Sequence, residues 1–261
     1  MTDPATDQSQ VFLDEHEELK PGQGFRFACH PGVPCFGACC SALDLMLTPY
    51  DTLRLRRSTH QTSRDFVHEY ADMVAMPGLG LPLLHMHMQD TGAKRCPFSR
   101  DGACAVYADR PSACRTYPLG RATRVEADGV TEQVFIMREA HCQGFEQQTQ
   151  CTTATWMAEQ GLTAYNSAND RFMALVSELR QFELDTGRHL SGQQTGMACL
   201  ALYQPDDFQR FLAGSRVMDR LDMTAGRRED VRHDEEACLD FGYDWLELSL
   251  MGHTEHLRPK E

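Results

Sequence analysis

After residue 150, hydrophobic positions recur with the spacing of amphipathic helices. Phe172, Leu175 and Leu179 would share one face of a helix over residues 165–182. The same spacing predicts further helices over residues 153–160, 195–203, 206–212 and 229–251. Trp156 and Trp245 are then expected to anchor the core of this region. We therefore expect residues 151–261 to be mainly helical.

Before residue 150 the apolar runs are shorter and are separated by Gly and Pro. Thr48-Pro49-Tyr50-Asp51 combines a capping threonine, a proline at the first helical position and an acid in the first turn, so a helix should begin there. A second helix is predicted over residues 63–74, and the apolar run 81–88 predicts a strand. Residues 121–125 and 130–137 flank Asp128-Gly129, which is a strong β-hairpin signal.

These patterns predict an α+β fold: a small, turn-rich unit with short strands and a hairpin, followed by a mainly helical C-terminal region. We divide the chain into a polar N-terminal arm (1–24), a cysteine-cluster metal-binding domain (25–150) and a helical C-terminal region (151–261). The division follows the distribution of cysteine, since Gly, Pro and Cys concentrate in the middle segment.

Composition narrows the classes of partner. The chain has 261 residues and is 41% hydrophobic, enough for a sizeable core. Its 38 acidic and 25 basic residues give a net charge of -13, which argues against nucleic acid and favours a basic protein as any macromolecular partner. No stretch approaches the roughly 18 apolar residues of a membrane span, so no membrane is expected. The polar, acidic start predicts no secretory signal and a cytoplasmic location. The oligomeric state is left open.

The chain has eleven cysteines, and eight of them are clustered in the first 142 residues. These eight are the candidate metal ligands: Cys29, Cys35, Cys39, Cys40, Cys96, Cys104, Cys114 and Cys142. In a reducing compartment, clustered cysteines are metal ligands or catalytic thiols more often than disulfides. The remaining three, Cys151, Cys199 and Cys238, are widely spaced and are expected to be small buried core residues.

Eight thiols make two sets of four, the number that tetrahedral zinc or an all-cysteine iron–sulfur cluster requires. Cys39 and Cys40 are adjacent, and neighbouring side chains rarely point the same way. They would therefore serve two different centres or bridge within one polynuclear centre. Gly32, Pro34 and Gly37 allow the backbone to wrap around a centre and to aim N–H groups at sulfur.

Two such sites would carry about -4 of charge, which needs compensation. Five arginines are close to the cysteines in sequence, and some of them are proposed to supply it, although any single one is more often a solvated surface residue: Arg26, Arg95, Arg100, Arg110 and Arg115. His30 and His141 adjoin cysteines, but the thiols already fill the ligand count, so we favour roles other than ligation for both. His85-Met86-His87-Met88 could offer soft copper ligands, but the alternation is more typical of a half-buried strand.

Several motifs together resemble the YkgJ-type cysteine-cluster family, known by its CxxCxxCC signature and described as a zinc- or iron-chelating domain. They are Cys96-Pro-Phe, Cys104-Ala-Val-Tyr, Arg110-Pro-Ser-Ala-Cys114-Arg and Cys142-Gln-Gly-Phe, with Cys35, Cys39 and Cys40 before them. The resemblance covers about residues 25–147, although the first cluster is spaced more widely than the signature. It implies zinc or iron held by these cysteines. The related flagellin lysine methylases carry a similar cluster thought to be iron–sulfur.

The leading hypothesis is a cytoplasmic metal-binding protein whose cysteine thiolates hold an iron–sulfur centre, of the 4Fe-4S type, with polynuclear zinc or iron ions as the alternative. A second hypothesis is a metal-dependent enzyme, either redox or protein-modifying in the manner of a lysine methylase. A third is an interaction module stapled by metal. The sequence identifies no catalytic residue and no phosphate-loop, dinucleotide or HExxH motif.

Overall fold

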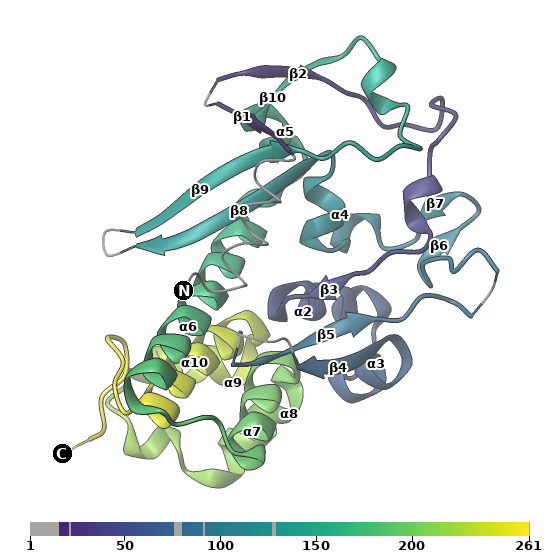
Figure 1. The fold of residues 1–261 in the computed structure, drawn as a ribbon. Helices are drawn as coiled ribbons and strands as arrows, with labels where there is room; N and C mark the ends of the chain where they lie inside the picture. Colours follow the sequence, from purple (N-terminus) through teal and green to yellow (C-terminus); the bar gives the residue numbers. More distant parts are fainter. Residues whose placement is uncertain (1–15, 21, 76–79, 91, 127–128, 261) are drawn as a thin grey trace. The chain divides into compact units, whose positions relative to one another are not determined.

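The computed structural model describes residues 16–20, 22–75, 80–90, 92–126 and 129–260 (Figure 1). The chain folds into two compact units, each assembled from two separate stretches. The first unit comprises residues 1–43 and 88–167, and the second comprises residues 44–87 and 168–261. Most of the predicted polar arm lies outside the described residues, and the sequence-based division at residues 24 and 150 stays a prediction.

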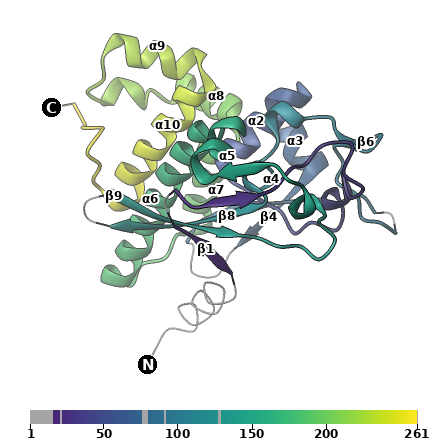
Figure 2. The ribbon, with the colours of Figure 1, turned by 90° about the horizontal axis from the view of Figure 1, so that it is seen from above.

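The described residues of the first unit form three small antiparallel sheets. In the largest, β8 (Leu119–Glu126) and β9 (Gly129–Ile136) form the predicted hairpin, and β1 (Glu17–Leu19) pairs with the other edge of β9 (Figure 2). Asp128 of the predicted turn lies outside the described residues. The second sheet pairs β2 (Gly24–Arg26) with β10 (Gln150–Thr152). The third is the short hairpin of β6 (Ser99–Arg100) and β7 (Ala103–Cys104).

Short helical elements complete the first unit. They are the 3-10 turns Ala38–Cys40, Tyr107–Asp109 and Gly144–Glu146, and the helices α4 (Ser112–Thr116) and α5 (Thr153–Glu159). Helix α5 is capped by the Thr152 hydroxyl, which accepts from the Thr155 N–H. Gly161 follows it with a φ of +63°, as expected for a residue that ends a helix.

Aromatic side chains hold the core of the first unit together. Phe27 is 1% exposed and meets Trp156 edge to face, with ring centroids 5.3 Å apart. Phe145 and Tyr117 approach the same ring at 5.1 and 6.0 Å. The Trp156 indole N–H donates to the Thr116 carbonyl at 3.1 Å, so the predicted core role of this tryptophan is confirmed.

The second unit contains a three-stranded antiparallel sheet in the order β3-β5-β4. Its strands are β3 (Met46–Leu47), β4 (Ala71–Ala75) and β5 (Pro82–Met86). Helix α2 (Pro49–Thr59) begins at the predicted residue, and Thr48 and Asp51 form a reciprocal capping box. Helix α3 (Ser63–Tyr70) ends earlier than predicted, because residues 71–75 pair along β5 instead. Tertiary strand pairing overrides the helical pattern there.

Helix α6 (Leu162–Thr186) begins in the first unit and belongs to the second from residue 168 onward. The helices that follow it in the second unit are α7 (Gly192–Tyr203), α8 (Pro205–Ser215), α9 (Ala225–His233) and α10 (Glu235–Leu246). Helix α10 continues as a π-helical turn over Glu247–Met251. The single helix predicted over residues 229–251 is wrong. Asp234 adopts an extended conformation, and its carboxylate accepts from the Ala237 N–H at 2.7 Å, so one helix ends and another is capped. Trp245 packs on Phe208 with centroids 5.3 Å apart.

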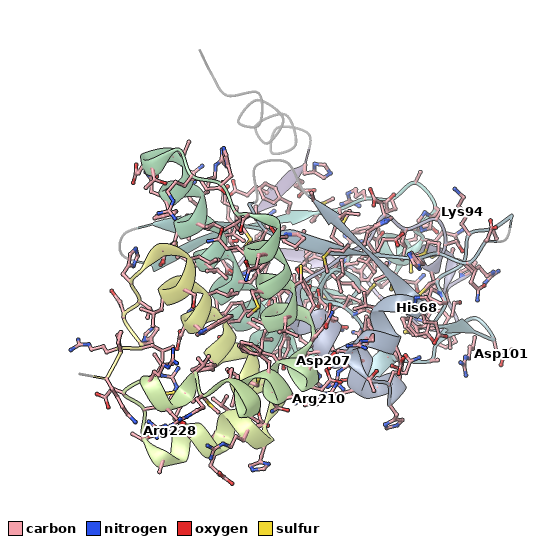
Figure 3. The ribbon with its side chains drawn as sticks, turned by 90° about the horizontal axis from the view of Figure 1, so that it is seen from below. His68, Lys94, Asp101, Asp207, Arg210 and Arg228 are labelled. Atoms are coloured by element: carbon pink, nitrogen blue, oxygen red, sulfur yellow. The ribbon has the colours of Figure 1, made fainter. Side chains whose placement is uncertain are left out.

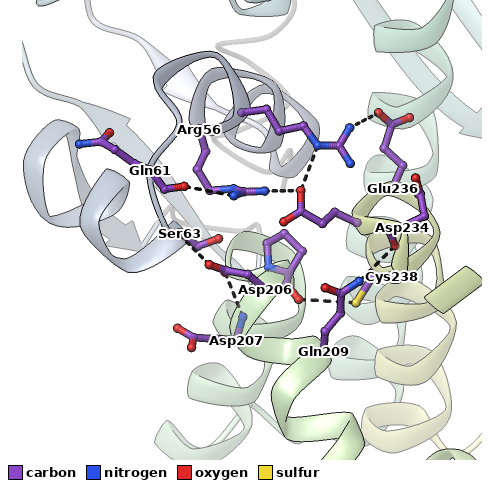
Figure 4. Close-up of polar contacts among 12 residues, drawn as sticks. Arg56, Gln61, Ser63, Asp206, Asp207, Gln209, Asp234, Glu236 and Cys238 are labelled. Atoms are coloured by element: carbon purple, nitrogen blue, oxygen red, sulfur yellow. Dashed lines mark hydrogen bonds and ion pairs between the residues drawn. The ribbon is translucent and has the colours of Figure 1, made fainter. Parts of the chain in front are cut away.

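Charged side chains join the helices of the second unit. Arg56 and Arg57 on α2 both contact the carboxylate of Glu235 on α10, and Arg57 also donates to Glu236 at 2.6 Å. Beside them, Asp206 accepts from the Ser63 N–H at 3.1 Å (Figure 4). Deeper in this unit Asp244 is 2% exposed and accepts from Arg171 at 2.8 Å and from Arg227.

The strand predicted over residues 81–88 is confirmed for β5, which ends at Met86, whereas His87 and Met88 follow the strand. Met86 is buried, whereas His85 and His87 are partly exposed and pair with Asp44 and Asp72 at 3.0 and 2.8 Å. The overall class, α+β with a mainly helical C-terminal region, is as predicted. Among the described residues, no helix has both the length and the apolar character that crossing a membrane requires.

Candidate metal centre

The structure places all eight candidate cysteines in the first unit. Cys29 and Cys35 lie in the loop after β2, and Cys39 and Cys40 occupy the 3-10 turn that follows. Cys96 precedes the β6–β7 hairpin, Cys104 ends it, Cys114 is in α4 and Cys142 precedes the third 3-10 turn. All eleven cysteines of the chain are free thiols. Cys151, Cys199 and Cys238 are buried, as predicted for core residues.

Main-chain hydrogen bonds join the first cysteine cluster to the second. The Cys96 N–H donates to the Cys40 carbonyl at 2.9 Å, and Ser41 bridges to Arg95. Nearby, Gly37 has a φ of +78°, and a Cβ there would lie 2.7 Å from the carbonyl oxygen of Gly102. Only glycine fits this approach between the first cluster and the turn of the β6–β7 hairpin, on which Asp101 is labelled in Figure 3.

The third cluster packs against the first. The Ala28 N–H donates to the Gly144 carbonyl at 3.1 Å, and the Gln143 N–H donates to the Cys35 sulfur at 3.1 Å. A Cβ on Gly144 would lie 2.5 Å from the Phe27 ring, so this position also requires glycine. Three separated stretches of the chain are thereby held side by side.

Four of the cysteines line one hollow of about 330 Å³, a volume that includes the part open to solvent. They are Cys29, Cys35, Cys39 and Cys142, and His141 lies among them. The rest of the lining includes Phe27, Val33 and Tyr117. Sulfur donors facing one hollow form a donor set suited to zinc or iron.

Neighbouring sulfurs are among the causes of the raised pKa values of several clustered thiols, which indicates that these sulfurs lie near one another. Burial raises the pKa of Cys29 to about 11, and the neighbouring sulfurs of Cys39, Cys35 and Cys142 add to the effect. A hydrogen bond to Cys39 raises the pKa of Cys40, as do burial and then the charges of Cys39, Cys96 and Cys114. Cys104 has a raised pKa chiefly through burial, with Cys39 adding to it. Each of the eight sulfurs is therefore within electrostatic range of others of the group.

Cys39 differs from Cys29, Cys40 and Cys104 in having a lowered pKa. The hydrogen bond from Cys40 lowers the pKa of Cys39 to about 6, with a further contribution from the charge of His141, and burial opposes both. One thiolate of the adjacent pair is thus favoured near neutral pH. Because a bound cation lowers the pKa of a coordinating thiol, the raised pKa values of Cys29, Cys40, Cys96 and Cys104 would fall on metal binding.

Backbone amides already point at several sulfurs. Besides the Gln143 bond to Cys35, the Phe98 and Ser99 amides bond to Cys96, and the Val106 amide bonds to Cys104. The bonds to Cys96 and Cys104 lower the pKa of these two thiols against the effect of burial. Such N–H donors are the outer interactions that orient thiolate ligands. The turn residues of the sequence indicated this, but they did not indicate which amides would donate.

Arg110 places a positive charge beside the cysteines. Burial lowers the pKa of this guanidinium, and the charges of Tyr107, Cys104 and Cys114 oppose the effect. Its side chain donates to the Tyr107 carbonyl at 2.6 Å and lies over the Tyr107 ring. Arg115 instead donates to the carbonyls of Arg110 and Gln160 at 3.0 and 2.7 Å, so it fixes the local fold.

Two further residues near the cluster were not singled out by the sequence. Tyr117 lines the hollow, and its phenol lies beside Cys142, where burial raises its pKa and the neighbouring thiol adds to the effect. Phe27 forms the floor between Gly144 and Tyr117. The only signal for Tyr117 was its position three residues after Cys114. His30 is turned to its own backbone, with its Nδ1 accepting from the Gly32 N–H at 3.1 Å.

The sulfurs are neighbours without a closed coordination shell. Within the described part of the chain, no three His, Cys, Asp or Glu side chains converge closely enough to hold one ion as they stand. Rotation of thiol side chains would be needed to bring donors to the roughly 2.3 Å of a zinc–sulfur bond. The backbone therefore supplies proximity, and ligation would supply the final geometry.

Four thiols that line one hollow, with four more cysteines close by, are the donor set of a metal-chelating class of site. Residues 28–143 match the family model described as "CxxCxxCC: Putative zinc- or iron-chelating domain". The resemblance seen in the motifs is thereby confirmed for this stretch, which is somewhat less than half of the chain. No curated protein matches the chain, and no solved structure does.

Proposed function

We propose that this chain is a metal-binding protein of a reducing, cytoplasmic environment whose eight clustered cysteines hold an iron–sulfur centre. The supporting observation is that four free thiols from two distant stretches line a single hollow, with the other four beside them. The family description supports zinc or iron as the bound metal. Soft thiolate donors and their N–H partners fit either metal.

Iron–sulfur is favoured over zinc for two reasons. The adjacent Cys39 and Cys40 suit a centre in which several metal ions are close together. The resemblance also extends to methylases whose cluster is thought to be iron–sulfur. When bound, such a cluster would supply one-electron chemistry. The protein would contribute the thiolates, the amides that point at Cys35, Cys96 and Cys104, and the charge of Arg110.

Anaerobic purification followed by iron, zinc and acid-labile sulfide analysis tests the proposal. We expect brown protein with visible absorption and comparable amounts of iron and sulfide. Cys114→Ser should lose metal, whereas Cys199→Ser, at a buried thiol of the second unit, should retain it. Colourless protein containing only zinc would refute the iron–sulfur assignment and leave the chelating function. Equal metal contents in both variants, or no metal in the parent chain, would refute ligation by the cluster.

A further inference from the structure

We propose that the eight cysteines form two neighbouring centres: a first set of Cys29, Cys35, Cys39 and Cys142, and a second set of Cys40, Cys96, Cys104 and Cys114. This inference rests on the proposed function, because it assigns ligands within the same cluster. Sequence spacing allowed either two centres or one polynuclear centre, and it did not say which cysteines belong together.

The hollow defines the first set. Of the eight cysteines, these four line it, and they come from the loop after β2 and from the loop before the third 3-10 turn. Cys29 is within electrostatic range of the other three. The Gln143 amide, which follows Cys142 directly, bonds to the Cys35 sulfur at 3.1 Å and ties the two loops together. These four cysteines are therefore grouped by one shared hollow.

The main chain defines the second set. The Cys96 N–H bonds to the Cys40 carbonyl at 2.9 Å, and Cys104 pairs with Ser99 across the hairpin that follows Cys96. Cys40 is within electrostatic range of Cys96 and Cys114. Arg110 interacts electrostatically with both Cys104 and Cys114, so one positive charge lies near these two cysteines of the second set.

Cys39 and Cys40 are the point where the two sets meet. They are consecutive in a 3-10 turn, in which neighbouring side chains diverge by about 120°. One can therefore face the hollow while the other faces the Cys96 loop. Their sulfurs remain hydrogen-bonded, and Cys39 is also within range of Cys96 and Cys104, so the two centres would be close enough to influence each other.

The two sets differ in shielding. Two cysteines of the first set are exposed, Cys29 and Cys39, against Cys114 alone in the second, whose Cys96 is buried and accepts two backbone amides. The second set also has the Val106 amide on Cys104. Because accessible ligands exchange more readily and outer hydrogen bonds raise affinity, metal should leave the first centre before the second.

Cobalt(II) is the probe for the test, since its tetrahedral thiolate complexes absorb visibly and it occupies zinc-type sites. The metal-free full-length protein is titrated anaerobically, alongside two variants of each set: Cys35→Ser and Cys142→Ser, and Cys96→Ser and Cys104→Ser. Cys238→Ser, at a buried thiol of the second unit, is the matched control. We expect each ligand variant to retain about half of the parent's tetrahedral cobalt, a Cys35→Ser/Cys96→Ser double variant to retain none, and the control to retain all.

A chelator pulse on the loaded parent protein gives a second readout that needs no substitution. Two release phases of similar amplitude, with the faster phase missing from Cys35→Ser and Cys142→Ser, support the two centres. A single release phase overturns them, as does loss of all cobalt by both variants of either set. A parent chain that binds no cobalt, zinc or iron refutes the proposed function itself, whereas a parent that binds metal in one phase refutes only the division into two sets.

Discussion

The two compact units of this protein are stabilised in different ways. The second unit is a conventional assembly, in which long amphipathic helices bury apolar faces and ion pairs such as Arg171–Asp244 join them. The first unit has short strands and turns, one aromatic cluster around Phe27 and a high density of free thiols. This contrast indicates that the second unit can be stable from packing alone, whereas the first has little core to sustain it without ligation.

Metal removal should produce the largest difference between the units. In proteins with structural metal sites the binding free energy is folding free energy, on the order of 10 kcal/mol for zinc. We therefore expect a chelator to abolish hydrogen-exchange protection in β6, β7 and α4 while α7 and α10 stay protected. Peptide-resolved hydrogen exchange by mass spectrometry measures this. Uniform loss of protection across both units would contradict the comparison.

The unfolding free energy of the second unit should depend strongly on its buried ion pairs. Asp244→Ala leaves Arg171 and Arg227 without their buried carboxylate, and removing one partner of such a pair typically costs about 3–5 kcal/mol. Urea unfolding of the second unit should shift accordingly, with metal content unchanged. Asp219→Ala, which removes an exposed i,i+3 partner of Arg216, is the control and should change stability by less than about 1 kcal/mol. A fall in metal content in Asp244→Ala would show that the units depend on each other.

Two glycine substitutions, one in each unit, test the difference between the units. Gly144→Ala would force a Cβ against Phe27 and the Ala28 carbonyl, at a cost of about 1–3 kcal/mol, and should weaken metal binding because Cys142 lies two residues away. Gly196→Ala, within α7, meets nothing within 4 Å and should stabilise its helix by about 0.5–1 kcal/mol. Thermal unfolding and competitive metal titration of both variants provide the measurements. Equal effects of the two on metal affinity would count against the packing of Gly144 at the site.

Arg110 should produce the smallest effect, and it should act on affinity rather than on folding. Arg110→Gln removes the positive charge near Cys104 and Cys114, and loss of an outer partner typically lowers metal affinity about 10–100-fold. Arg100→Gln, at an exposed position of β6, should leave affinity unchanged. Competition with a chromophoric chelator measures both. Identical affinities for the two variants would mean that Arg110 serves only the local fold.

Local chemistry explains what the sequence could and could not predict. The start of α2 at Thr48 and Pro49 depended on neighbouring residues alone, and so did the β8–β9 hairpin. The end of α3 at Tyr70 depended on pairing with β5, a partner that the local pattern does not contain. The break at Asp234 was missed because the apolar spacing continues across it.

The candidate site shows the same limit. Clustering and motif spacing identified the eight cysteines, since these are properties of the sequence. Which thiols face which others depends on contacts between distant loops, such as the Cys40 carbonyl with the Cys96 amide. The same holds for Tyr117 beside Cys142, which nothing in the local pattern marked. Among the five arginines proposed to balance charge, only the fold could distinguish the role of Arg110 from that of Arg115.

The pairing of β2 with β10 has a consequence for the energetics of ligation. Residues 24–26 and 150–152 are hydrogen-bonded, so everything between them is a loop already closed by the polypeptide. Bringing the ends of a long flexible segment together costs entropy that grows with the logarithm of its length. Here β-strand pairing bears that cost, so ligation has to order only the segments inside the closed loop. The part of the entropy that strand pairing has already removed does not count against metal affinity.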